Sequence, residues 1–482
     1  MAGALPLRIP GRLFNFRPDG NSRHLLRRTA APVIASNRER NVGLMETINV
    51  GLFGLGVVGC GVVEILQRNR ELIRQRLGAE LRITKAVTAH PDKERPVPLE
   101  DIAVSADPEA ILGDPEIHIV AELIGGVGLA REVVLRALES GKPVVTANKA
   151  LLAEHAGEVF GKAYERGVGL GIEASVAGGI PVLRALREGL AADRVLEITG
   201  IVNGTCNYIL TKMSQEDAPF DEVLAEAQRL GYAEADPAFD VGGLDAAQKL
   251  AVLIDIAYGT TVNYPDIHVE GIESVTPMDI GYARQLGYVI KLLAIGKPRG
   301  DRVEARVHPT LVAREHLLAS VNGVFNAVFL TGDNADATLF YGRGAGALPT
   351  GSAVVGDLID LARDVLGGSP GRVPPLSVQR THLRQIPVMP IEEILSEYYL
   401  RFQVQDRPGV LAQITQVMGG RNISIESMFQ PSQADRPEDP VQVVLITHQA
   451  REKDVQDSLR KIQPMEFVRG PTQMIRIERF ET

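Results

Sequence analysis

The chain has 482 residues, which is too long for a single hydrophobic core, so two to four domains are expected. Hydrophobic residues make up 45% and charged residues 23%, ordinary values for a globular chain that argue against extensive disorder. The net charge of -9 disfavours a nucleic-acid-binding surface, and two cysteines exclude a disulfide framework or a cysteine-rich metal site. No apolar run reaches the ~18 residues that a membrane helix needs, so neither nucleic acid nor membrane is expected as a partner.

The first 44 residues differ from the remainder. They hold eight arginines against two acids, Asp19 and Glu39, so they carry +6 while the rest of the chain carries -15. Such a segment is typical either of an organelle transit peptide or of a start assigned too far upstream, because Met45 stands just before the first clear strand. The second interpretation is favoured, since residues 1–44 form no amphipathic helix pattern. We expect this segment to be disordered or mis-assigned and the protein to be cytoplasmic, with organellar import as the alternative.

A glycine-rich turn follows the first predicted strand, Ile48–Phe53, and precedes an apolar helix that runs through Leu66. The turn reads Gly54-Leu55-Gly56-Val57-Val58-Gly59, which is the G-x-G-x-x-G pattern of dinucleotide binding in its strand–turn–helix context. Its glycines permit a tight turn, close approach of a diphosphate and close packing of helix on strand, and the helix start offers free N–H groups. These six residues are predicted to bind NAD or NADP, with a plain turn as the alternative.

Strands and helices then alternate as far as residue 175. The predicted strands are Leu81–Val87, Ile117–Leu123, Val144–Thr146 and Val168–Glu173, and a helix is predicted over Arg131–Ser140. This order is typical of a doubly wound parallel sheet, so residues 45–175 are predicted to form a Rossmann-like domain. The second strand ends at Ala89 and His90, which are neither acid nor arginine, so the choice between NAD and NADP stays open.

Residues 176–341 mix strands and helices in a pattern typical of an α+β substrate and dimerisation domain. The predicted elements are the strand Leu196–Val202, the helices Asp221–Leu230 and Leu244–Tyr258, and the strand Arg302–His308. A glycine-rich stretch then precedes a helix predicted over Ala353–Val365, and residues 342–380 are expected to complete the nucleotide domain. A linker is expected over residues 381–396.

The last segment, residues 397–482, has the order βαββαβ of a ferredoxin-like sandwich. Its predicted elements are Tyr398–Val404, Val410–Met418, Ile423–Phe429, Val441–His448, Glu452–Gln463 and Met474–Phe480. The whole chain is therefore assigned to the α/β class with a third, ferredoxin-like domain.

Lys149 directly follows the predicted strand Val144–Thr146. Ligands collect at the carboxyl ends of strands in open α/β sheets, and Asn148 is a favourable N-cap for a helix predicted over Lys149–Phe160. A lysine in the first helical turn faces the positive end of the helix dipole, a placement that favours recruitment of an anion. A surface lysine with a buried stem is the alternative.

The densest polar cluster contains Glu234, Asp236, Asp240, Asp245 and Lys249. Asp245 and Lys249 are four residues apart and share a helix face, on a helix that is apolar nearly all round. A buried acid–base pair is costly without a purpose, and a lysine in a dry pocket can exchange a proton at neutral pH. The cluster indicates either an acid–base site or a routine surface pair beside turn acids.

Glu173 precedes a glycine-rich bend over residues 174–181. Such a bend directs several carbonyl oxygens inward, which together with one carboxylate suits a monovalent or hard cation. A plain turn into a proline-started helix is the alternative.

Seven motifs in this order make the chain resemble homoserine dehydrogenases that carry a C-terminal ACT domain. They are GLGVVG, GKPVVTANKALLA, EASVAGGIPVL, VNGTCNYIL, GYAEADPAFDVGGLDAAQKLA, GRGAGALPTGSAVVGD and DRPGVLAQIT, and the resemblance covers about residues 47–480. It implies NAD(P)-dependent interconversion of L-aspartate 4-semialdehyde and L-homoserine on the route to threonine, methionine and isoleucine. It also implies a homodimer or homotetramer.

The resemblance carries roles to particular residues. Lys249 is expected to be the general acid/base, with Lys149 between nicotinamide and substrate, and Glu234, Asp240 and Asp245 are expected to hold the substrate. The other implied sets are Thr146 and Gly351 at the cofactor, Glu173 with the carbonyls of Val176, Gly178 and Ile180 at a sodium ion, and Asp406, Gly409 and Asn422 at a threonine effector. One departure is Ala89, where the family often has arginine, although Lys93 and Arg95 could reach a phosphate.

Two other functions are compatible with the residues alone. One is another Rossmann oxidoreductase fused to the same sensor, and the other is a regulator that binds a dinucleotide and an amino acid without turnover. The two lysines beside acids favour an enzyme.

Overall fold

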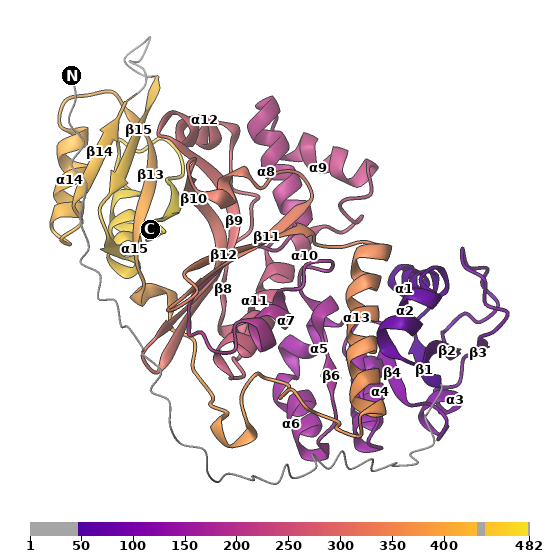
Figure 1. Cartoon of the computed structure of the whole chain (residues 1–482). Helices are drawn as coiled ribbons and strands as arrows, with labels where there is room; N and C mark the ends of the chain where they lie inside the picture. The colour runs from indigo at the N-terminus through magenta and orange to yellow at the C-terminus, as the bar shows by residue number, and fades with distance from the viewer. Residues whose placement is uncertain (1–46, 431–438, 481–482) are drawn as a thin grey trace, which may run out of the picture. The chain divides into compact units, whose positions relative to one another are not determined.

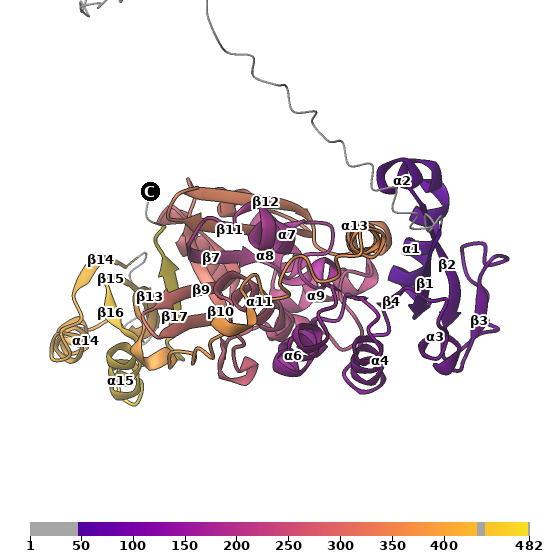
Figure 2. The same ribbon diagram turned by 60° about the horizontal axis from the view of Figure 1, so that its bottom comes forward.

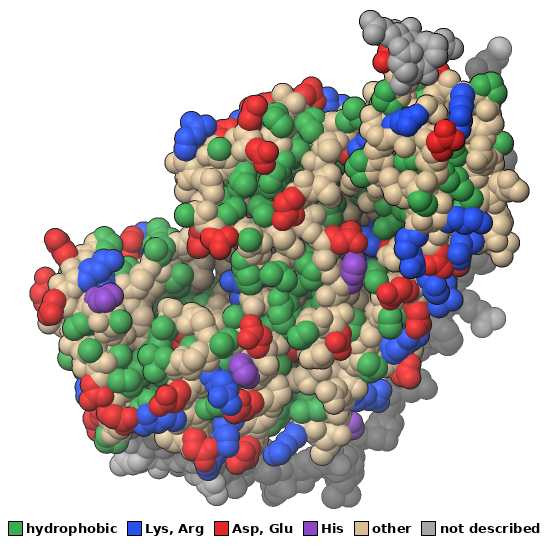
Figure 3. All heavy atoms as spheres, turned by 180° about the vertical axis from the view of Figure 1, so that it is seen from behind, with side chains coloured by type: hydrophobic (Ala, Val, Ile, Leu, Met, Phe, Trp, Pro, Cys, Tyr) green, Lys and Arg blue, Asp and Glu red, His purple; other side chains and the backbone are tan. Residues whose placement is uncertain are grey.

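The structure is a computed structural model that describes residues 47–430 and 439–480. The prediction for residues 1–44 lies outside the described residues. None of the helices in these two ranges is both long enough and apolar enough to cross a membrane. On the face seen in Figure 3, Lys and Arg side chains are interspersed with Asp and Glu, in keeping with 51 basic and 60 acidic residues in the chain.

The first sheet has six strands in the order β3-β2-β1-β4-β5-β6, and all neighbours pair in parallel (Figure 1). Its strands are β1 Thr47–Phe53, β2 Glu80–Val87, β3 Ala103–Ser105, β4 Ile119–Glu122, β5 Val144–Thr146 and β6 Leu170–Gly171. Its helices are α1 Val57–Arg68, α2 Arg70–Leu77, α3 Glu109–Leu112, α4 Gly128–Glu139, α5 Lys149–Glu154 and α6 Ala156–Arg166. The strand order reverses between β1 and β4, so the predicted doubly wound sheet is confirmed and its ligand crevice lies at their carboxyl ends.

Two local predictions in this part were wrong, and one strand was missed. The helix expected over Lys149–Phe160 is two helices, because the backbone at His155 (φ -127°, ψ 27°) is not helical. The strand expected over Val168–Glu173 is limited to Leu170–Gly171, and Glu173 instead begins a 3-10 turn, Glu173–Ser175. The three-residue strand β3 was missed, since so short a segment carries little periodicity.

The second sheet has eleven strands, nine of them in the order β12-β11-β7-β9-β10-β17-β13-β15-β14. The first part of this sheet consists of β7 Val195–Ile201, β8 His268–Val269, β9 Tyr288–Arg299, β10 Arg302–Ala313, β11 Phe325–Gly332 and β12 Ala337–Arg343. Its helices are α7 Val182–Arg184, α8 Gly204–Glu216, α9 Phe220–Arg229, α10 Ala238–Val241, α11 Leu244–Tyr258 and α12 Pro277–Gln285. Both α8 and α11 pack on β9, and α11 is buried nearly all round, as its apolar sequence predicted.

The C-terminal module supplies the rest of the second sheet. It contains β13 Leu395–Gln405, α14 Val410–Gly419, β14 Ile425–Phe429, β15 Pro440–Thr447, β16 Ala450–Arg451, α15 Glu452–Ile462 and β17 Gln473–Glu478. The order βαββαβ is confirmed apart from the additional two-residue strand β16. The module does not have a sheet of its own, because β17 pairs in parallel with β10 through Thr310–Val312. This pairing satisfies the backbone groups that β17 would otherwise expose as an edge strand.

Helix α13, Ala347–Leu366, returns to the nucleotide half and lies against α1 (Figures 1 and 2). It begins six residues before the predicted start at Ala353, so Gly351, which was expected in the glycine-rich stretch before the helix, is helical. Two glycines permit the contact: a Cβ on Gly61 would lie 2.2 Å from the Ala347 carbonyl oxygen, and one on Gly351 would lie 3.1 Å from the Gly61 carbonyl carbon. The close crossing brings the loop before α13 next to the glycine turn before α1.

We predict that Gly61→Val destabilises the protein by about 1–3 kcal/mol, because the added side chain meets backbone atoms that cannot move independently. Urea unfolding of the full chain measures the change. The matched control is Gly161→Ala on α6, where an added Cβ meets no atom within 4 Å. That variant should gain about 0.5–1 kcal/mol, and equal behaviour of the two variants would contradict the role given to the α1–α13 crossing.

Candidate active site

A cavity of about 480 Å³ lies where the two halves of the chain meet. Segments from the nucleotide half, the start of α8, the α10–α11 region and the loop between β12 and α13 all line it. The polar side chains that line it are Lys149, Ser175, Asn203, Thr205, Tyr232, Asp240, Asp245, Lys249, Asn326, Arg343 and Thr350. The cavity therefore brings together Lys149, Asp240, Asp245 and Lys249, four residues predicted from sequence.

The Asp245 carboxylate pairs with two ammonium groups in this cavity. Lys249 Nζ lies 2.7 Å from Asp245 Oδ2, and Lys149 Nζ lies 3.3 Å from Asp245 Oδ1. Lys249 Nζ also donates to the Val202 carbonyl oxygen at 2.7 Å. The Lys249 side chain is 13% exposed and that of Lys149 33% exposed, and both residues line the cavity.

Electrostatics keep Asp245 ionised. Burial alone would raise the pKa of Asp245, but the charges of Lys249 and Lys149 and the hydrogen bonds from Lys249 and Asn203 outweigh it and hold the pKa below its ordinary value. Asn203 Nδ2 donates to Asp245 Oδ2 and to Asp240 Oδ1, each at 2.8 Å. One amide group thus fixes the separation of the two carboxylates.

The helix starts explain why these side chains converge. Asp245 lies in the first turn of α11, where the helix dipole favours a carboxylate, and Gly243 (φ 85°) precedes it in a left-handed conformation. Asn148 caps α5 by accepting from the Leu151 N–H, as predicted, and this places Lys149 in the first turn. The Asn203 side chain likewise caps α8 through the Cys206 N–H.

The glycine turn has the shape that a dinucleotide requires. Gly54 has φ 99°, and a Cβ on Gly59 would lie 2.0 Å from the Gly54 carbonyl oxygen, so both positions require glycine. A Cβ on Gly56 would meet no atom within 4 Å, which leaves room for a diphosphate at the start of α1. The first turn of α1 contains no acid. The turn therefore fits the phosphates of NAD or NADP.

Two residues predicted to contact the cofactor, Thr146 and Gly351, do not line the cavity and instead make contacts within the protein. Thr146 is fully buried, and its hydroxyl donates to Glu122 Oε2 at 2.6 Å. Glu122 Oε1 accepts from the Ile124 and Gly125 N–H groups, so the pair shapes the turn after β4. Gly351 is buried against α1, and residues Arg343–Gly346 line the cavity in its place.

Glu234 is the one predicted substrate residue that does not line the cavity. Its side chain is exposed on the segment between α9 and α10, and its carbonyl oxygen accepts from Gln228 Nε2 at 3.1 Å. Gly231 and Tyr232 of the same segment do line the cavity.

The bend expected to hold a cation has unusual backbone geometry. Ala177 and Gly178 have φ values of 53° and 41°. Glu173 accepts the N–H groups of Leu183 and Arg184 at 2.9 and 2.6 Å, and burial together with the charge of Asp357 raises the pKa of Glu173 to about 7. Within residues 47–430 and 439–480, no group of three or more His, Cys, Asp or Glu side chains is arranged to hold a metal.

Comparisons with known proteins agree with this geometry. The family model for homoserine dehydrogenase matches residues 181–359, that for its NAD-binding domain matches residues 54–173, and that for the ACT domain matches residues 398–463. A homoserine dehydrogenase of Pseudomonas aeruginosa is 46% identical over 434 residues, which cover 90% of this chain and 99% of the relative. The chain belongs to the homoserine dehydrogenase family.

Other homoserine dehydrogenases support the assignment. That of Neisseria gonorrhoeae is 45% identical, with 90% of this chain and 99% of the relative covered. The crystal structure of the Thiobacillus denitrificans enzyme has a TM-score of 0.84 at 45% identity and covers 90% of this chain and 98% of that chain. A hyperthermophilic archaeal enzyme solved with NADPH has a TM-score of 0.56 at 27% identity, with 65% of this chain and 97% of that chain covered. As a homoserine dehydrogenase, the chain is an NAD(P)-dependent oxidoreductase with a C-terminal ACT domain.

Sequence reasoning missed several polar residues of this homoserine dehydrogenase site. Asn203, Tyr232 and Arg343 line the cavity but were given no role. Each lies inside a motif quoted for the resemblance, so the sequence did contain a signal for them. Asn326 also lines the cavity, and the Oδ1 atom of Asn326 is buried without a hydrogen-bond partner among the described residues. It lies on β11, a strand that was not predicted, so no signal in the sequence pointed to it.

Proposed function

We propose that the chain catalyses the reversible reduction of L-aspartate 4-semialdehyde to L-homoserine, on the route to threonine, methionine and isoleucine. The observation that carries this proposal is the pair Lys249–Asp245 in a cavity that Ala147, Lys149 and Ala174 of the nucleotide half also line. A bound nicotinamide cofactor supplies the hydride that the aldehyde carbon receives. The remaining chemistry belongs to the residues of the cavity.

Lys249 donates a proton to the oxygen on which negative charge develops, and it takes that proton back in the oxidation direction. Its hydrogen bonds to Asp245 and the Val202 carbonyl hold the ammonium in one orientation. Asp245 and Asp240 hold the ammonium end of the substrate, so that the aldehyde has a fixed position. Glu234 is assigned to the same role because Gly231 and Tyr232 of its segment line the cavity. Lys149, whose Nζ lies 3.3 Å from Asp245 Oδ1, would contact both the bound nicotinamide and the substrate.

The cofactor proposal is NADP or NAD, bound by the turn from Gly54 to Gly59. Arg95 Nε donates to the Leu55 carbonyl oxygen at 2.9 Å, which places a guanidinium beside this turn. A cation at this position supports NADP, because it can face a 2′-phosphate. Lys93 lies two residues before it and adds a second positive charge.

We predict that Lys249→Met lowers kcat by roughly 10²- to 10⁴-fold, because proton transfer to the developing alkoxide is lost. Absorbance at the nicotinamide band, with homoserine and either NADP or NAD, measures turnover. Fluorescence titration should give a cofactor Kd within about threefold of the wild-type value, since the glycine turn is unchanged.

The matched control is Lys212→Met on α8, a lysine that pairs with Glu216 outside the cavity and should keep full turnover. Turnover near the wild-type value in Lys249→Met would remove the role proposed for this lysine. Absence of homoserine oxidation by the wild-type protein would reject the proposed reaction itself.

We also propose a sodium site formed by Glu173 and the carbonyls of Val176, Gly178 and Ile180. Among the described residues, no hydrogen bond reaches the carbonyl oxygen of Val176 or Gly178, so both can ligate a cation. A carboxylate accepts more than the two N–H groups that Glu173 now receives, which leaves it capacity for a hard ion. The Ile180 carbonyl accepts from the Val182 N–H at 2.8 Å and is the weakest candidate of the set.

The sodium proposal predicts that NaCl raises the melting temperature of the wild-type protein more than choline chloride does at equal ionic strength. An ion that binds only the folded state increases the free energy of unfolding by RT ln(1 + [Na⁺]/Kd). The sodium-specific part should disappear in Glu173→Gln, in which one charged ligand is lost. Identical melting curves in the two salts would contradict the site.

We propose that L-threonine binds the ACT domain at Asp406, Gly409 and Asn422. Gly409 (φ 90°) precedes α14 and Asn422 (φ 58°) follows it. The ten residues of α14 separate these ends by about 15 Å, so one effector cannot contact both within a single chain. Two ACT domains side by side could place Gly409 of one copy next to Asn422 of the other, so that one effector contacts both. This arrangement supports a homodimer or homotetramer.

The effector proposal predicts that L-threonine inhibits wild-type turnover and that D-threonine does not. Asp406→Ala should lose at least tenfold in sensitivity and keep its basal rate, because Asp406 lies outside the cavity. A rate that stays constant across the L-threonine titration would contradict the proposal.

We further propose a cytoplasmic location, which is supported by two free buried thiols, Cys60 and Cys206. Cell fractionation tests this location.

A further inference from the structure

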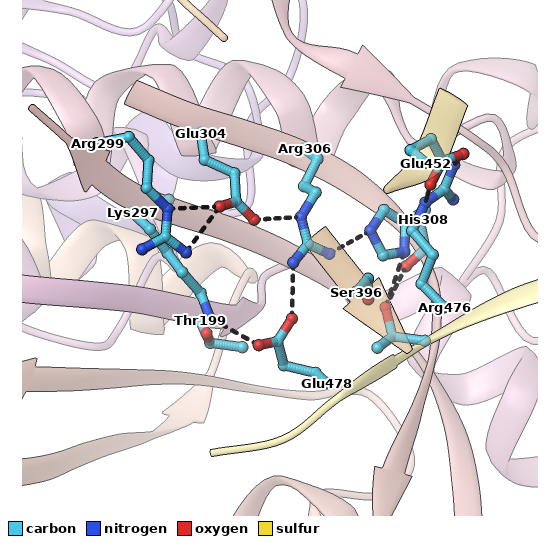
Figure 4. Close-up of polar contacts among 12 residues, drawn as sticks. Thr199, Lys297, Arg299, Glu304, Arg306, His308, Ser396, Glu452, Arg476 and Glu478 are labelled. Atoms are coloured by element: carbon cyan, nitrogen blue, oxygen red, sulfur yellow. Dashed lines mark hydrogen bonds and ion pairs between the residues drawn. The ribbon is translucent and has the colours of Figure 1, made fainter. Parts of the chain in front are cut away.

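The junction between β10 and β17 contains an unusual number of buried charges. Arg306 pairs with Glu304 and with Glu478, in each case at 2.8 Å, and each of these side chains is at most 6% exposed. Figure 4 shows Arg306 between the two carboxylates, with His308 on its other side and Arg476 further along the junction. Charges are rarely buried unless they are paired, so the two halves of the second sheet are joined by ionic contacts as well as by backbone pairing.

Arg476 of β17 links three separate elements. Its guanidinium donates to both oxygens of Glu452, at 2.8 and 2.6 Å, and to both oxygens of Glu270, at 2.9 and 2.8 Å. Arg476 and Glu452 are fully buried, and Glu452 also accepts the Tyr398 hydroxyl. The two bidentate pairs use the planar geometry of a guanidinium, which a lysine cannot reproduce. Arg476 therefore ties the ACT domain to the segment that follows β8.

The segment after β8 lies directly against the turn that carries the active-site acids. Glu270 N–H donates to the Val307 carbonyl oxygen at 2.8 Å, and Ile272 N–H donates to the Val241 carbonyl oxygen at 2.9 Å. Val241 is the residue after Asp240. A Cβ on Gly243, the residue before α11, would lie 3.0 Å from Val269 Cγ1, so no space separates the segment from the start of α11.

These contacts form a continuous path from the ACT domain to the cavity. Arg476 holds Glu270, the segment of Glu270 holds the α10–α11 turn, and this turn carries Asp240 and Asp245. Asp245 in turn pairs with Lys249 and Lys149. Glu270 itself does not line the cavity, so any effect on the reaction must act through these neighbours.

We propose that Glu270 is a positioning residue for the reaction, and that its ion pair with Arg476 makes the ACT domain part of the support of the active site. The inference rests on the roles proposed above for Asp245 and Lys249. Arg476 is fully buried in this pair, whereas the Glu270 side chain is 37% exposed. An ion pair that removes a charge from water adds little stability over apolar packing, so the specific benefit of this pair is that it fixes the register of the two elements. Loss of either partner lets the α10–α11 turn shift and moves Asp245 relative to Lys249.

The test is Glu270→Gln in the full-length protein. We expect kcat to fall at least tenfold and the KM for homoserine to rise at least threefold, while the KM for the cofactor stays within twofold. Glu452→Gln, which changes the same guanidinium from the ACT side, should shift these parameters in the same direction. The control is Glu426→Gln, a half-exposed ACT carboxylate that pairs with Arg479 and should leave all three parameters unchanged.

A purely structural role is distinguished by measuring the melting temperature and kcat on the same folded samples. A lower melting temperature with wild-type kcat and KM in Glu270→Gln would overturn the inference. Arg476→Lys keeps the buried charge and provides a second variant if Glu270→Gln does not fold; wild-type kinetics there would overturn it equally. Wild-type homoserine turnover, measured first, separates failure of this inference from failure of the proposed function.

Discussion

The Asp245 carboxylate holds two ammonium groups, those of Lys249 and Lys149, at the wall of one cavity. Two like charges repel each other, so this arrangement persists only while an ionised acid lies between them. The pKa of Asp245, held below its ordinary value, keeps that acid charged across the neutral range. Asn203 then fixes Asp245 relative to Asp240, and the active site is in this sense one hydrogen-bonded unit.

The rest of the chain supports this unit from two sides. On the nucleotide side, the contact of α1 with α13 brings the glycine turn and the loop Arg343–Gly346 to the same region. On the other side, α11 packs on the eleven-stranded sheet, and the ACT domain extends that sheet through β17. The ACT domain is therefore joined to the catalytic part by main-chain pairing and by the buried charges around Arg476 and Arg306.

The sequence predicted the features that depend on local pattern. The glycine turn, the cap at Asn148 and the apolar helix α11 each have a short-range signal and were confirmed. The antiparallel strands β9, β11 and β12 were not predicted, because strand pairing depends on distant residues. Asn326 was missed for the same reason, because it lies on β11. The ion pair of Arg476 with Glu270 was missed because the two residues are 206 positions apart in the sequence. Gly351 was expected to precede the helix, which was predicted to begin at Ala353, but the helix begins at Ala347, since a proline such as Pro349 is tolerated in the first helical turn.

The account is tested most directly by a crystal structure of the protein with homoserine and the oxidised cofactor bound. It predicts that the substrate hydroxyl lies within hydrogen-bonding distance of Lys249 Nζ, about 3 Å, with the cofactor diphosphate at Gly56. A homoserine hydroxyl held by another side chain, with Lys249 Nζ more than about 5 Å away, would contradict it.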